Sequence, residues 1–310
     1  MPDSQNDFGR GLLSMLQKIW PEAVTEFRQA MKNGLAVICC SLLTAIMLSA
    51  GCPASATEVA GAVCISAMML QSSRALVGLA IQTVSEVSEY SKLLFPVMAA
   101  AASARGAVTS ASALSIGTSA LTAFLNSFLR RVMVPAVYLF LIAAVANCAL
   151  GTNSLKQIRD IIKKFAAWFL KVVLTAFLTY MSITGAVAGS ADKTALKAAK
   201  AAISTVVPVI GKTLSDASEA LLLSADIARN SVGIYGIFAF LGICILPFSK
   251  IGAHYLVLKG IAALCSIVGS KRQTALVDDF AEAMGLLLGM TGVMCALSVI
   301  GVACFLKGVG

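Results

Sequence analysis

Charged residues are scarce in this sequence. They make up 13% of its 310 residues, whereas about 25% is typical of a soluble domain. Hydrophobic residues supply 58% of the chain, and the mean hydropathy is +0.88. This composition excludes a disordered chain, which requires low hydrophobicity, and argues against an ordinary soluble enzyme. The class that remains is a membrane protein that crosses the bilayer several times.

The residues that carry most enzyme chemistry are also missing. The chain has one histidine, His254, which excludes a zinc site built from several histidines. No nucleophile motif accompanies it, and the sequence contains neither a Walker A motif nor a dinucleotide-binding fingerprint. We therefore predict a protein that is not an enzyme, that holds no cofactor or metal, and that cannot hydrolyse ATP by a P-loop route.

Signals for disulfides are absent as well. There are nine cysteines, most of them inside apolar runs, and no two are arranged as Cys-x-x-Cys. Cysteines in such surroundings behave as small buried apolar residues. The sequence therefore does not predict a disulfide framework.

Long stretches without any charge are what the sequence has instead. A bilayer core of about 30 Å needs roughly 20 apolar residues in a helix. Strand alternation is absent over these runs, which leaves helices as the way to satisfy the backbone in lipid. Six stretches are free of Asp, Glu, Lys and Arg, at 33–57, 106–129, 132–155, 172–191, 230–249 and 283–306. Three further apolar runs lie at 59–81, 93–104 and 250–268.

These runs predict an all-α, polytopic transmembrane helical bundle with about eight or nine spans. We expect a short turn at 51–53 and a polar connection at 82–92. Further breaks are predicted at Arg130-Arg131, which divides two windows, and at 247–250. Residues 270–282 are predicted to form a polar link before the last span. Gly285 and Gly289 in that span are spaced for close helix packing.

Two segments are predicted to lie on the membrane as amphipathic interfacial helices. Residues 11–32 place apolar side chains close to one face, and Pro21 should bend or divide this helix; a helix packed under the bundle is the equal alternative for this segment. Residues 154–168 have a similar pattern and lead into a span at about 167–188. The net charge of +9 lies largely beside spans, so we expect contact with membrane lipid headgroups rather than nucleic acid.

The segment 190–229 is the least membrane-like. Its first half carries a basic stripe and its second half an acidic stripe, with a Pro-Val-Ile-Gly break between them. This pattern predicts a charged amphipathic helical hairpin, either lying in solvent or re-entering the membrane along a solute path. The candidate pathway or docking residues are Lys193, Lys197, Lys200, Pro208, Gly211, Asp216, Glu219 and Asp226.

Three more candidates lie elsewhere in the chain. Arg130 and Arg131 conflict with a simple positive-inside topology, which leaves three alternatives: a re-entrant window, an Arg pair buried in the bundle, or a failure of the rule. His254 shares a helix face with Lys250, and a lone histidine within a membrane is a functional candidate. A hydrogen-bonded structural histidine is the interpretation we favour.

The same features divide the chain into four parts. They are an interfacial segment at 1–32, an N-terminal transmembrane bundle at 33–189, the charged hairpin at 190–229, and a C-terminal transmembrane bundle at 230–310.

One stretch also resembles a known family in both order and spacing. The matching pieces are Gly185-Ala-Val-Ala-Gly-Ser-Ala-Asp192, Ala198-Ala-Lys200, Pro208-Val-Ile-Gly211, Leu214-Ser-Asp216-Ala, Asn230-Ser-Val-Gly233-Ile and Gly236. They are similar to the stage III sporulation protein AE family, and weaker similarity extends over most of the chain.

The resemblance implies a role in endospore development. It implies a polytopic core component of a secretion-like channel between mother cell and forespore, in the mother-cell membrane, acting as conduit or export gate. The implied partners are other stage III sporulation A-operon proteins, including a separate ATPase and ring-forming proteins, and a homo-oligomer stays open. The family supplies no catalytic residues to transfer.

Two other functions remain as alternatives. A stand-alone secondary transporter of a small solute would also explain broken helices and embedded charges, although no convincing internal repeat is present. A purely structural scaffold that positions partner rings is the third.

Overall fold

The computed structural model describes residues 3–103, 108–150, 153–183, 231–268 and 270–309. Every element in these ranges is an α-helix, as predicted. In chain order they are α1 (Asp3–Ser49), α2 (Ala54–Ser103), α3 (Val108–Leu150), α4 (Asn153–Ile183), α7 (Ser231–Val268) and α8 (Lys271–Val309).

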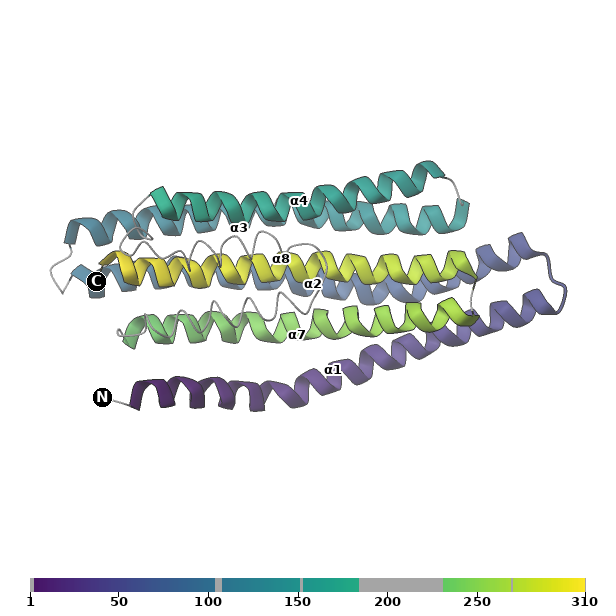
Figure 1. Cartoon of the computed structure of the whole chain (residues 1–310), viewed down its shortest axis with the longest axis horizontal. Helices are drawn as coiled ribbons and strands as arrows, with labels where there is room; N and C mark the ends of the chain where they lie inside the picture. Colours follow the sequence, from purple (N-terminus) through teal and green to yellow (C-terminus); the bar gives the residue numbers. More distant parts are fainter. Residues whose placement is uncertain (1–2, 104–107, 151–152, 184–230, 269, 310) are drawn as a thin grey trace.

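The helices lie lengthwise beside one another in an elongated bundle, with both chain ends at the same end of it (Figure 1). α8 lies at the centre and packs against α2, α3, α4 and α7, while α1 packs on α7 and α2. The large side chains that are fully buried come from α2, α3, α4, α7 and α8, and include Phe95, Phe140, Phe177, Phe240 and Phe280. The core is therefore a packed apolar interior built around α8.

Five of these helices are long and apolar enough to cross a membrane. The candidate spans are Pro21–Ser49, Ala54–Met98, Ile116–Leu150, Gly236–Ile267 and Lys271–Ala303. The predicted count of eight or nine spans is not confirmed, because three pairs of predicted runs each fall on one continuous helix, namely α2, α3 and α7. α2 alone has 50 residues, a length of about 75 Å, which is more than twice the bilayer core.

The polar connection predicted at 82–92 is wrong, because α2 runs straight through it. Its hydroxyl groups bond back to the helix: Thr83 Oγ1 donates to the Leu79 carbonyl at 2.8 Å, and Ser91 Oγ donates to the Val87 carbonyl at 2.7 Å. On the outer face Gln82 Nε2 donates to Glu86 Oε1 at 2.8 Å. The polar residues are thus satisfied locally, and Val87 remains buried on the inner face.

Prolines do not divide the helices either. Pro21 lies inside α1 and Pro247 lies inside α7, so the break predicted at 247–250 is wrong and Pro21 does not divide α1. Proline removes one backbone hydrogen bond and frees a carbonyl one turn earlier. Near both prolines a side-chain hydroxyl also bonds to a different carbonyl of the same helix, Thr25 Oγ1 to that of Pro21 at 2.8 Å and Ser249 Oγ to that of Ile245 at 2.7 Å.

The turn predicted at 51–53 is confirmed. α1 ends at Ser49 and α2 begins at Ala54, and Gly51 has a φ of +89°, which favours a residue without a Cβ. Close packing at the glycine pair of α8 is also found. A Cβ on Gly285 would lie 3.0 Å from the Tyr255 ring of α7, and one on Gly289 would lie 3.0 Å from Leu170 of α4.

Candidate functional site: a charge cluster joining three helices

The first turns of α8 carry three carboxylates where a polar link was predicted. α8 begins at Lys271, so Asp278, Asp279 and Glu282 project from the helix itself. That prediction is wrong because cations on two neighbouring helices neutralise these acids. The cations are Arg159 and Lys163 of α4 and Lys259 of α7. We call the six side chains the charge cluster: Arg159, Lys163, Lys259, Asp278, Asp279 and Glu282.

Two carboxylates of the charge cluster connect α8 to α4. Arg159 Nη1 donates to Asp279 Oδ2 at 2.8 Å. Lys163 Nζ lies 3.0 Å from Glu282 Oε2. Arg159 and Lys163 are four residues apart on α4, and the acids that they contact, Asp279 and Glu282, are three apart on α8, so each pair shares one helix face. The two pairs therefore join the helices at successive turns.

The third cation connects α8 to α7. Lys259 Nζ donates to Asp278 Oδ1 at 2.6 Å and to Glu282 Oε1 at 2.7 Å. Glu282 thus accepts from lysines on two different helices. Lys250 instead reaches Glu26 of α1 at 2.8 Å.

The centre of the charge cluster is shielded from solvent. The Asp279 side chain is 8% exposed and that of Arg159 is 14% exposed. The pKa of Arg159 lies above its ordinary value: burial lowers the pKa, but Asp279 and the adjacent Asp160 raise it by more. Removal of one partner from a buried pair leaves an uncompensated charge, which is strongly destabilising. The cluster therefore fixes which faces of α4, α7 and α8 meet.

Further polar contacts hold α1 and α2 to the same end of the bundle. Arg272 Nε lies 3.5 Å from Glu58 Oε2 of α2. Thr44 Oγ1 of α1 donates to Gln273 Oε1 of α8 at 3.0 Å. The first residues of α8 consequently contact a carboxylate of α2 and a hydroxyl of α1.

The sequence candidates do not coincide with this cluster. His254 is half-buried, and its Nδ1 lies 3.0 Å from the Lys250 carbonyl oxygen one turn earlier in α7. Nδ1–H donates to a carbonyl at that distance. The structure thus contains the hydrogen bond that we favoured for this histidine.

Arg130 and Arg131 lie in the middle of α3 and are exposed. The alternative in which the pair is buried in the bundle is therefore wrong, and so is the break predicted there. The eight candidates of the 190–229 segment, from Lys193 to Asp226, lie outside the described residues.

Sequence reasoning missed the charge cluster because it treated 154–168 and 270–282 as surface segments. A signal was available in the spacing. Arg159 and Lys163 are four residues apart, and the acids that they contact, Asp279 and Glu282, are three apart, so each pair lies on one helix face. Complementary charges at matched helical spacing indicate paired faces, but the partner helix cannot be identified from spacing alone.

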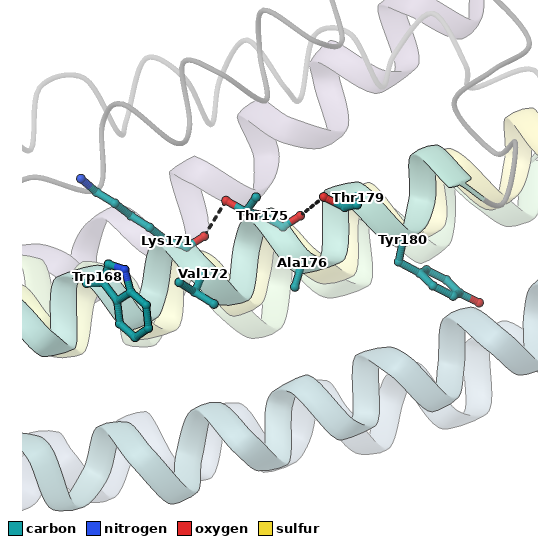
Figure 2. Close-up of a pocket in the computed structure, with 7 residues that line it drawn as sticks. All are labelled: Trp168, Lys171, Val172, Thr175, Ala176, Thr179 and Tyr180. Carbon is teal, nitrogen blue, oxygen red and sulfur yellow. Dashed lines mark hydrogen bonds between the residues drawn. The ribbon is translucent and has the colours of Figure 1, made fainter.

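A separate open groove of about 610 Å³ runs along α4 (Figure 2). Its lining residues are Trp168, Lys171, Val172, Thr175, Ala176, Thr179 and Tyr180. Thr175 Oγ1 donates to the Lys171 carbonyl and Thr179 Oγ1 to the Thr175 carbonyl, both at 2.8 Å. These hydroxyls bond within their own helix, so the groove offers an apolar surface rather than catalytic groups.

The charge cluster as a whole is a set of paired opposite charges. Its three cations and three carboxylates balance, and they are used in pairing one another. Across the described residues no group of three or more His, Cys, Asp or Glu side chains is placed to hold a metal ion. What the arrangement provides is specific cohesion between helices in an apolar bundle.

Comparison with known proteins agrees with the resemblance seen in the sequence. A model of the family described as stage III sporulation protein AE matches residues 4–307. A relative named stage III sporulation protein AE, from Bacillus subtilis (strain 168), is 22% identical over 285 residues, which cover 87% of this chain and 71% of the relative. No solved structure matches this chain. Because the family match extends over nearly all of the sequence, and the bundle contains helices able to cross a membrane, the chain belongs to the stage III sporulation protein AE family.

Proposed function

We propose that this chain is the polytopic membrane core of a secretion-like channel between mother cell and forespore, required for endospore development. It resides in the mother-cell membrane and acts as conduit or export gate. The observation that carries the proposal is the family match over residues 4–307. The bundle of five candidate membrane spans supports it, because a channel component must cross the bilayer.

The packed centre of the bundle bears on how it would act in this role. α8 fills the centre, and side chains such as Phe280, Met284 and Leu287 are fully buried there. A packed centre suits a gate whose helices separate, or a conduit formed between this bundle and its neighbours. The charge cluster would hold the closed arrangement of α4, α7 and α8.

The proposal includes partners and excludes catalysis. Energy comes from a separate ATPase of the same operon, because this sequence has no nucleotide-binding motif. Ring-forming proteins of that operon dock on the membrane core, and the chain itself acts without a cofactor. The charged 190–229 segment is the proposed pathway or docking element.

Deletion of the gene in its spore-forming host tests the proposal. Engulfment, forespore volume and late forespore reporter expression are followed with and without complementation. We expect normal engulfment followed by a collapsing, silent forespore that complementation restores. Normal spores from the deletion strain would overturn the proposal.

A stand-alone secondary transporter of a small solute is the second candidate, favoured by ion pairs inside an apolar bundle. The purified protein in liposomes distinguishes the two, because a transporter moves its solute without partners. Variants that still assemble with the partners distinguish the channel from a scaffold that transports nothing. Failure of such variants to support the forespore would exclude it.

A further inference from the structure

One buried face of α3 is polar near the start of the helix and apolar farther along it. From Leu129 onward its buried residues are mainly apolar, and Leu129 and Met133 are both 0% exposed. Toward the start of the helix the same face presents Thr118, Thr122 and Asn126, which are also 0% exposed. These three residues follow one another at intervals of four, so they form one continuous polar stripe. We call them the α3 polar stripe.

The α3 polar stripe has four polar atoms without a hydrogen-bond partner among the described residues. They are Thr118 Oγ1, Thr122 Oγ1, and both Nδ2 and Oδ1 of Asn126. The buried hydroxyls of Ser91 and Ser298 behave differently, since each donates to a carbonyl of its own helix. A buried polar group left unpaired loses its hydration without compensation. Four such atoms on one face therefore indicate a partner that the described residues do not supply.

The stripe lies where α2, α3 and α8 come together. A Cβ placed on Gly301 of α8 would lie 3.1 Å from Phe95 Cζ of α2 and 3.5 Å from Thr118 Cγ2. At the other end of the same helix pair, Cys148 Sγ donates to the Arg272 carbonyl at 3.4 Å. α3 and α8 are therefore antiparallel. Two turns along each helix from the Thr118–Gly301 contact, toward the Cys148–Arg272 contact, Asn126 of α3 is level with Met294 of α8.

The surroundings fix the chemical class of the missing partner. Among the described residues that are buried, only Asp279 carries a charge. It lies about 28 Å along α8 from Ser298. Glu86 and Glu89 of α2 are exposed. An uncharged molecule is therefore required. This molecule must both donate and accept hydrogen bonds, because the unpaired atoms include an amide N–H group and an amide oxygen.

At the level of Thr118, the close approach of Phe95 and Thr118 to Gly301 leaves room for no molecule larger than water. Ser91 and Ser298 lie one turn from Phe95 and Gly301, on the side toward Thr122. Their hydroxyl oxygens already donate and retain the capacity to accept. A buried water typically makes about three hydrogen bonds to such groups. We propose that Thr118, Thr122 and Asn126 form an internal hydration site, which holds ordered water between α3 and α8.

Radiolytic footprinting of the purified full chain tests this site, because hydroxyl radicals formed from a buried water oxidise the side chains beside it. Met294 and Met133 are a matched pair, since both are 0% exposed and only Met294 lies at the level of the stripe. We expect Met294 to be oxidised several-fold faster than Met133. Equal rates for the two methionines in the unaltered protein would overturn the proposal, and this comparison needs no variant.

Asn126→Leu provides the second measurement. It removes two of the unpaired atoms and fills their space, so we expect the oxidation rate of Met294 to fall to that of Met133. An unchanged Met294 rate in a variant that still elutes as folded protein would also overturn the proposal. The hydration site does not depend on the channel role, because the readout is made on the isolated protein.

Discussion

Arg159 and Asp279 are 120 residues apart in sequence, yet their side chains meet at 2.8 Å between α4 and the central helix α8. This pair is the most shielded contact of the charge cluster. It joins a peripheral amphipathic helix to the core at the point where α8 begins to be surrounded by other helices. The contact explains how α8 tolerates carboxylates at the start of an otherwise apolar helix.

Asp279→Ala should destabilise the protein by about 3 kcal/mol or more, because it leaves the Arg159 guanidinium buried without its main partner. Thermal or denaturant unfolding of the protein in detergent measures the loss. Asp160→Ala is the matched control, since Asp160 also contacts Arg159 but its side chain is 46% exposed. For the control we expect a loss below about 1 kcal/mol. Similar losses for both variants would contradict the importance of burial.

Replacing both members of the pair should restore much of the stability. Arg159→Met with Asp279→Leu removes the two charges together and keeps similar volumes. Apolar replacement of a buried ion pair is often neutral or stabilising. The same unfolding measurement should place the double variant well above Asp279→Ala. A double variant as unstable as the single one would mean that the charges have a role beyond mutual neutralisation.

Gly301→Val should lower stability by about 1 to 3 kcal/mol, because the added atoms must displace Phe95 and Thr118 in a packed interior. Gly260→Ala is the contrasting change within α7. Nothing lies within 4 Å of a Cβ at Gly260, so alanine should stabilise by roughly 0.5 to 1 kcal/mol through helix propensity. Unfolding midpoints of the two variants should therefore move in opposite directions.

His254→Leu should leave spore formation close to that of the unaltered strain. The Nδ1 atom bonds a carbonyl within its own helix, and such a hydrogen bond contributes only about 0.5 to 1.5 kcal/mol. The variant is placed at the native locus, and heat-resistant spores are counted. A collapse of forespore reporter expression with normal protein levels would instead mark His254 as a functional residue.

Charge reversal in the 190–229 segment should impair the forespore more than reversal on α2. Asp216→Lys with Glu219→Lys alters the acidic stripe that the sequence predicts for a pathway or docking element. Glu86→Lys with Glu89→Lys changes two exposed residues of α2 and serves as the matched control. Late forespore reporter expression is the readout. Equal tolerance of the two pairs would remove the case for a pathway in this segment.

The sequence by itself determined the class of this protein. Charge-free runs long enough to cross a bilayer required helices in lipid, and the ordered motifs from Gly185 to Gly236 pointed to the family. The turn at Gly51 could also be predicted from the sequence, because the residues at 51–53 favour a turn over a continuous helix. These features are local, so one segment of chain contains all the information that defines them.

The tertiary structure alone decided how many separate helices those runs form and which faces meet. Polar residues at 82–92, the Arg130-Arg131 pair and Pro247 each suggest an end when read locally. In the bundle each lies inside a continuous helix: the hydroxyls of Thr83 and Ser91 bond back to α2, the two arginines are exposed on α3, and α7 runs through Pro247. The charge cluster forms only where α4, α7 and α8 pack together, and no local sequence pattern indicates which helices will be neighbours. Pairing of distant charges lowers the free energy only after the chain has folded, which is why the sequence showed the charges but not their partners.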